Sequence, residues 1–119
     1  MATAVKRKLS GSTAGMGIKI AQTATLGTTI HASTSETIEG SFDEIWLWAY
    51  NSHSEDVLLT IEFGAAVTPT HNISVTIPKL SGLVPVVPGL ILQDSKTVTA
   101  FAAVGDVVTL SGFVNRMTD

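Results

Sequence analysis

Short apolar segments, several with alternating hydrophobic and polar residues, run the length of the chain and are separated by turn-forming residues. An alternation with a period of two is typical of half-buried strands, and helical periodicity is scarcely visible. Gly105-Asp106 links two apolar runs in the manner of a hairpin turn. The pattern predicts eight strands: Gly17–Thr23, Thr28–Ala32, Asp43–Asn51, Val57–Phe63, Ile73–Ile77, Leu83–Leu92, Thr97–Val104 and Val107–Arg116.

Eight short strands in a chain of 119 residues predict an all-β fold, an eight-stranded antiparallel sandwich. The connection Ser33–Phe42 is long enough to cross between two sheets, which favours a jelly roll. An immunoglobulin-like sandwich is the alternative, and the absence of a cysteine pair with its tryptophan spacing weighs against it. Residues 16–119 are expected to form this single domain. Residues 1–15, mostly small and polar, are expected to form a flexible, extended N-terminal arm.

The segment Asp43–Asn51 is apolar on both of its predicted faces. Ile45, Leu47 and Ala49 alternate with three aromatic residues, and one of the two sets has to fill the core. The other set then needs cover, because each aromatic side chain can bury about 150–250 Å². The aromatic residues are therefore interpreted as core, as a subunit interface or as a ligand platform; they are Trp46, Trp48 and Tyr50.

Two long runs of the chain are almost without charge. Gly64 to Gln93 contains only Lys79 as a charged residue, and Leu9 to Ser35 contains only Lys19. Soluble monomers usually carry about 25–35% charged residues on their surface, so these runs indicate that much of the surface is covered in the working state. Within the first run, the neighbours Val86 and Val87 should point to opposite faces, one into the core and one toward an interface.

The charge and composition of the chain exclude several classes of function. A net charge of −3 gives no support for a nucleic-acid partner, and the one basic cluster, Lys6-Arg7-Lys8, is interpreted as a solvated arm or a tether to an acidic surface. No segment approaches the roughly 18–20 apolar residues that span a membrane. His31, His53 and His71 lie on different segments, and no cysteine is present. We therefore expect no metal site and no cofactor.

No motif for catalysis stands out. Gly11–Gly17 is rich in glycine but is followed by a strand, whereas a phosphate cradle requires a helix N-terminus at that point. The adjacent carboxylates Asp43 and Glu44 should point to opposite faces of their strand, which argues against a paired acid/base site. No serine lies in a Gly-x-Ser-x-Gly motif. We expect no catalytic residues and no enzymatic activity.

The last third of the chain resembles a known family. The residues VPVVPGLIL at 84–92, AFAA at 100–103, VVTL at 107–110 and GFVNR at 112–116 look like the closing strands of head decoration, or cement, proteins of tailed bacteriophages. The likeness covers about Leu83 to Met117 and implies a jelly roll on the virion surface. It further implies a homotrimer that clamps neighbouring subunits of the major capsid protein, with no catalytic residues.

Three hypotheses therefore remain open. The first is the capsid decoration protein, in which Arg116 either pairs with a carboxylate of a neighbour or is a solvated strand-end charge. The second is a carbohydrate-binding β-sandwich module in which Trp46, Trp48 and Tyr50 form a stacking platform. The third is a tail or fibre component of a phage particle.

Overall fold

The computed structural model describes residues 2–67 and 69–119, and within these residues the chain forms nine β-strands and no helix. The predicted all-β sandwich is confirmed, with nine strands in place of eight. The strands are β1 (Thr3–Lys8), β2 (Ile18–Lys19), β3 (Thr28–Ala32), β4 (Phe42–Asn51), β5 (Val57–Gly64), β6 (Asn72–Ile77), β7 (Val84–Leu92), β8 (Thr97–Ala102) and β9 (Val108–Thr118).

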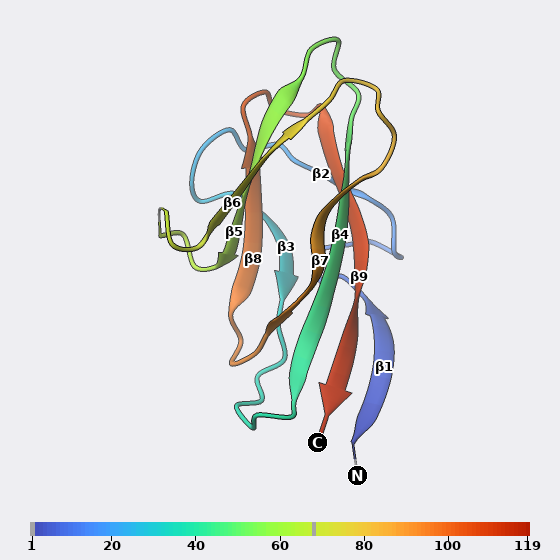
Figure 1. The fold of residues 1–119 in the computed structure, drawn as a ribbon, viewed down its shortest axis with the longest axis vertical. Helices are drawn as coiled ribbons and strands as arrows, with labels where there is room; N and C mark the ends of the chain where they lie inside the picture. Colours follow the sequence, from blue (N-terminus) through green and yellow to red (C-terminus); the bar gives the residue numbers. More distant parts are fainter. Residues whose placement is uncertain (1, 68) are drawn as a thin grey trace.

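The strands form two antiparallel sheets (Figure 1). Sheet A has the order β1-β9-β4-β7, and the short β2 also pairs with β9. Sheet B has the order β3-β8-β5-β6. The edge strands β6 and β7 lie on the same side of the sandwich, where β4 of sheet A contacts β6 of sheet B. Most connections therefore pass from one sheet to the other. As a result, strands that are far apart in the sequence become neighbours within each sheet.

The N-terminal segment is not the flexible arm that we expected. Thr3–Lys8 forms β1 and pairs with β9 along its whole length, from Thr3 opposite Thr118 to Lys8 opposite Phe113. All six of its side chains are exposed, so the strand has no apolar alternation by which the sequence could reveal it. Leu9 follows it with an exposed fraction of only 1%, and fixes the end of the strand in the core.

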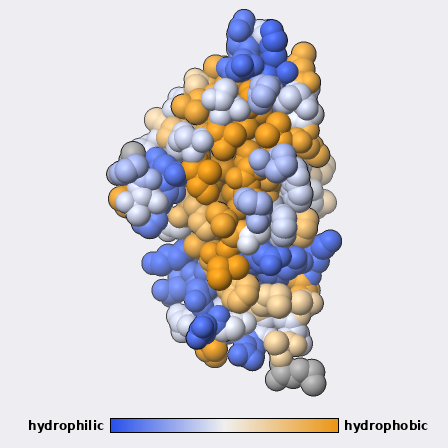
Figure 2. Space-filling view, viewed as in Figure 1, coloured by the Kyte–Doolittle hydropathy of each residue, from blue (hydrophilic) through white to orange (hydrophobic). Residues whose placement is uncertain are grey.

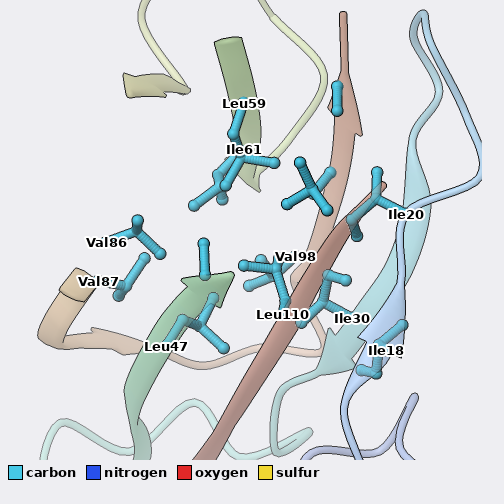
Figure 3. Packing of buried hydrophobic residues seen from close by; sticks show 14 of the residues in the cluster. Ile18, Ile20, Ile30, Leu47, Leu59, Ile61, Val86, Val87, Val98 and Leu110 are labelled. Carbon is cyan, nitrogen blue, oxygen red and sulfur yellow. The ribbon is translucent and has the colours of Figure 1, made fainter. Parts of the chain in front are cut away.

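The core lies between the two sheets and is built from alternate residues of each inner face (Figure 3). Leu47 of β4 and Leu110 of β9 come from sheet A, and Leu59 and Ile61 of β5 face them from sheet B. Burial of apolar surface at about 25 cal/mol per Å² provides the main driving force for such a sandwich. The strand alternation that the sequence displays is thus the pattern that fills this core.

Strands β4 and β9 approach each other closely at Gly112. A Cβ atom at this position would lie 1.9 Å from the backbone oxygen of Trp46, far inside any allowed contact. Glycine is the residue type that permits such an approach of two backbones. The same pairing brings Phe113 directly opposite Trp46 and therefore sets the geometry of the outer face of sheet A.

Candidate functional site

The outer face of sheet A carries a cluster of three aromatic rings, which we name the aromatic face: Trp46, Trp48 and Phe113. The ring centroids of Trp46 and Trp48 lie 6.3 Å apart, those of Trp46 and Phe113 6.3 Å, and those of Trp48 and Phe113 6.0 Å. The three planes deviate from parallel by only 16–27°. All three side chains are partly exposed, and Tyr50 continues the row along β4. The three rings thus pack against one another as one partly exposed cluster on the outer face of sheet A.

Polar side chains hold the aromatic face in place. Trp46 Nε1 donates a hydrogen bond to Glu44 Oε1 at 2.7 Å, and Asn115 Nδ2 donates to the same oxygen at 3.1 Å. These two hydrogen bonds lower the pKa of Glu44 below its usual value, so the carboxylate is charged at neutral pH. On the other side, Gly89 of β7 has a φ of +81°, and a Cβ atom there would lie 2.8 Å from the Trp46 ring. Glycine at this position leaves room for the indole.

The basic cluster near the N-terminus lies beside these rings. The Lys6 ammonium nitrogen is 4.5 Å from the centroid of the Phe113 ring, within the range of a cation–π interaction. Lys8 is the register partner of Phe113, and direct partners in an antiparallel pair point to the same face. Neither of the two interpretations made from the sequence, a solvated arm or a tether, anticipated this contact. It brings together residues that are about 107 positions apart in the chain.

Val86 and Val87 do not point to opposite faces, and that expectation was wrong. Both side chains are buried, with exposed fractions of 7% and 1%. The pairing of β4 with β7 has two register shifts, one between Ile45 and Trp46 and one between Leu47 and Trp48. Such bulges interrupt the alternation of a strand, so that two successive residues can point inward. Both valines are therefore core residues.

Arg116 is paired within its own chain and is only partly exposed to solvent. It lies on the inner side of β9, where its Nε donates to Asp43 Oδ1 at 2.7 Å and its Nη2 donates to Asp43 Oδ2 at 3.0 Å. The Asp43 side chain is fully buried, whereas 26% of the Arg116 side chain is exposed. The expectation of an intermolecular partner was therefore wrong, because the carboxylate is supplied by the same chain.

Asp43 also binds His31 and a backbone amide. Burial opposes the ionisation of Asp43, but hydrogen bonds from Arg116 and His31 outweigh it and lower its pKa. The Ser10 amide donates to His31 Nδ1 at 3.0 Å, so the proton of this imidazole is on Nε2, which lies 2.7 Å from Asp43 Oδ2. The Thr34 amide donates to the same oxygen at 3.1 Å. This arrangement satisfies a buried charge and ties three segments of the chain together.

A second buried carboxylate lies on the outer side of sheet B. Glu62 has an exposed fraction of 2% and accepts hydrogen bonds from the Thr25 hydroxyl, the Gly27 amide at 2.8 Å and the Thr99 hydroxyl at 2.6 Å. Burial opposes its ionisation, but these three donors lower its pKa. Glu62 thus fixes the segment 25–27 over the sheet.

The two strands of the charge-poor run, β6 and β7, lie at one side of the sandwich, which we name the β6–β7 side. It consists of β6, β7 and residues 78–83 between them. Hydrophobic side chains run down the middle of this side in Figure 2. Several inward-facing residues on this side are only partly buried: Ile73, Val75, Val84 and Leu92. Large apolar residues around them are exposed: Leu80, Leu83, Leu90 and Ile91.

Other features of the described residues do not assemble into a reactive site. No three His, Cys, Asp or Glu side chains come together as metal ligands within residues 2–67 and 69–119. Over the same residues, there is no helix of the length and hydrophobicity that crossing a bilayer requires. An open hollow near the end of β7 is lined by Phe42 and Ile91, but Gln93 at its rim donates its amide to the backbone oxygens of Ile38 and Ser41.

Comparison of the sequence with known protein families and with curated proteins, and of the fold with solved structures, finds no match.

Proposed function

We propose that this chain is a structural, non-enzymatic virion protein that decorates the outside of a phage head and stabilises contacts between major capsid subunits. The observation that carries the proposal is the β6–β7 side, with its exposed apolar residues and its almost complete lack of charge. The resemblance of Leu83–Met117 to head decoration proteins supports the same role. In this proposal the protein acts as a homotrimer on the capsid surface.

The edge strands give the physical argument. Monomeric β-proteins protect their edges with charged side chains, prolines or bulges, because an open edge pairs readily with other chains. Strand β7 is protected by Pro85, Pro88 and the register shifts opposite β4. Strand β6, with the sequence NISVTI, has neither charge nor proline. A surface of this kind is stable when sister subunits or the capsid cover it.

We also infer that the sandwich is a jelly roll. Strands β3, β5, β6 and β8 belong to sheet B, and β4, β7 and β9 belong to sheet A. The chain therefore crosses between the sheets at every connection from β3 to β9 except the hairpin between β5 and β6. This order supports a jelly roll, a fold found in viral capsid proteins and in lectins.

Light scattering coupled to size-exclusion chromatography tests the assembly. We expect the purified wild type to be a trimer at micromolar concentration and Leu83→Asp to be a folded monomer. Leu83 has an exposed fraction of 62%, so the change leaves the core intact. Met16→Asp is the matched control, because Met16 is equally exposed at 62% but lies outside the β6–β7 side. A wild-type monomer, or dissociation by Met16→Asp alone, would contradict the proposal.

The location on the particle is tested by electron microscopy. We expect density for this chain on the outer surface of the head at the junctions of capsid subunits, with the β6–β7 side covered. Density on the tail or its fibres would instead support the tail-component hypothesis and refute the decoration role.

A further inference from the structure

The fold places the basic residues of β1 next to the aromatic face, although the two lie far apart in the sequence. We propose that this face of sheet A binds an acidic polysaccharide, a saccharide chain that bears carboxylate groups. The site comprises Trp46, Trp48, Phe113, Glu44, Asn115, Lys6 and Lys8. It borders the β6–β7 side along β7, where Ile91 is the register partner of Glu44, but its residues come from β1, β4 and β9, so the inference does not depend on how the protein attaches to a capsid.

The rings provide a surface for sugar rings. Trp46, Trp48 and Phe113 are partly exposed and stack against one another, so their exposed parts form one continuous apolar patch. A pyranose ring has an apolar face of C–H groups that can lie against such a surface. Binding sites for small ligands combine aromatic walls with a few well-placed polar groups. The aromatic face has both kinds of group.

The polar atoms around the rings match sugar hydroxyls. Glu44 uses Oε1 for both of its hydrogen bonds, and its Oε2 has no partner in the described part of the chain. Among the same residues, Trp48 Nε1 and Asn115 Oδ1 also lack partners, which leaves one donor and two acceptors at the surface. Hydroxyl groups can donate as well as accept, and they satisfy such a mixed set.

The charge around the rings favours an acidic saccharide. In the strands of sheet A, the register places three lysines on the outer face, Lys6, Lys8 and Lys19, and a single carboxylate, Glu44. The chain as a whole has a net charge of −3, so this face is positive against the overall charge. Lys19 is partly neutralised by Asp106 at 4.0 Å, whereas Lys6 and Lys8 have no acidic partner in the described chain. Carboxylates on a saccharide supply that partner.

A nucleic acid fits this surface less well. Stacking on aromatic rings and neutralisation by basic residues would also suit a single strand of DNA or RNA. However, Glu44 lies beside Trp46, and its pKa is lowered, so a negative charge remains at one end of the site. A saccharide can turn its hydroxyl groups toward Glu44 and its carboxylates toward Lys6 and Lys8, whereas a nucleic acid carries a phosphate with every base that it stacks.

The test uses the full chain and a hexamer of alginate, a linear polymer of uronic acids, followed by tryptophan fluorescence and calorimetry. We expect saturable binding that weakens at least about tenfold in Trp48→Ala, as for an aromatic residue at the centre of an interface. The double variant Lys6→Ala/Lys8→Ala should bind more weakly, and its binding should depend less on salt. Phe101→Ala is the matched control, because Phe101 is a partly exposed aromatic residue on the outer side of sheet B.

Circular dichroism and thermal unfolding show whether each variant is folded, so that a loss of binding is not mistaken for a loss of structure. The proposal is overturned if the wild type does not bind the uronate hexamer, or if Phe101→Ala weakens binding as much as Trp48→Ala. Equal affinity for cellohexaose, a neutral hexamer, would show that the lysines do not contribute to binding and would overturn the proposal of an acidic ligand. Tighter binding of a twelve-residue thymidine oligonucleotide would replace the saccharide with a nucleic acid.

Discussion

Replacement of Asp43 by asparagine should be strongly destabilising, although the two side chains have nearly the same shape. The carboxylate accepts hydrogen bonds from four donor groups, Arg116 Nε and Nη2, His31 Nε2 and the Thr34 amide. An asparagine has only one acceptor oxygen, so its NH₂ group would face N–H groups that also donate. The Arg116 guanidinium and the Thr34 amide nitrogen can only donate. His31 would have to move its proton to Nδ1, which already accepts from the Ser10 amide.

The size of the effect follows from burial. Breaking a buried ion pair by removing one partner costs about 3–5 kcal/mol, because a charge is left without compensation. The partial exposure of Arg116 relieves some of this cost, so we expect about 3 kcal/mol, the lower end of that range. A domain of this size is stable by about 5–15 kcal/mol, so the variant should fold but with little reserve.

Urea unfolding followed by fluorescence measures this cost. With a slope of about 2 kcal/mol/M, a loss of about 3 kcal/mol lowers the midpoint by about 1.5 M. Asp106→Asn is the control, because Asp106 is 63% exposed and lies 4.0 Å from Lys19, a pair whose removal should cost less than about 1 kcal/mol. A cost for Asp43→Asn below about 1 kcal/mol, or equal to that of the control, would refute the reasoning.

The same carboxylates predict a dependence of stability on pH. The pKa values of Asp43 and Glu62 are lowered in the folded state, so the unfolded chain binds more protons as the pH falls. The contribution of these two carboxylates to the free energy of unfolding is complete above their ordinary pKa values of about 4. It is lost as the pH drops through their lowered pKa values in the folded state. The urea midpoint should therefore decline below about pH 4. Asp43→Asn should show a shallower decline than wild type, and an equally steep one would contradict this account.

Three further substitutions test other parts of the structure. Glu62→Gln should cost only about 1–2 kcal/mol, because the hydroxyls of Thr25 and Thr99 can turn to accept from the new amide; urea unfolding measures it, and a cost equal to that of Asp43→Asn would contradict it. Gly112→Ala should cost about 3 kcal/mol or more, because the added Cβ meets a backbone oxygen; an unchanged thermal midpoint would show that β4 and β9 can separate. Val87→Asp should yield unfolded protein by circular dichroism, because its side chain is 1% exposed; a folded variant would place this residue outside the core.

Much of the fold could be predicted from the sequence because most of the strands show a clear alternation of apolar and polar residues. The strand Thr28–Ala32 was predicted with the observed bounds, and the bounds of the others from Asp43 onward differ from the prediction by at most two residues. The predicted strand Gly17–Thr23 was reduced to the two residues of β2, because the contact with β9 ends at Ile20, whose amide donates to Val108, and Gln22 already accepts a hydrogen bond from Ala102 of β8. Strand β1 was missed because all of its side chains are exposed, and backbone pairing with β9, which local sequence does not reveal, places it in the sheet.

The candidate site was predicted only in part. Trp46 and Trp48 share a face because they are two residues apart in one strand, and the sequence alone indicates this. Their contact with Phe113 and the approach of Lys6 depend on which strands are neighbours in sheet A, and local sequence does not determine this order. The inward position of Asp43 was visible in the alternation with Ile45, but its partners Arg116 and His31 come from other strands.

The position of β9 has a consequence for the synthesis of the protein. This strand is the last of the nine along the chain, but in sheet A it lies between β1 and β4 and also pairs with β2. A nascent chain that still lacks residues 108–118 therefore contains all four strands of sheet B but can join only β4 to β7 in sheet A. Until β9 is made, the part of the inner face of sheet B that β9 covers stays open to solvent. We therefore expect the sandwich to close late during synthesis, and a variant without β9 to expose apolar surface and aggregate.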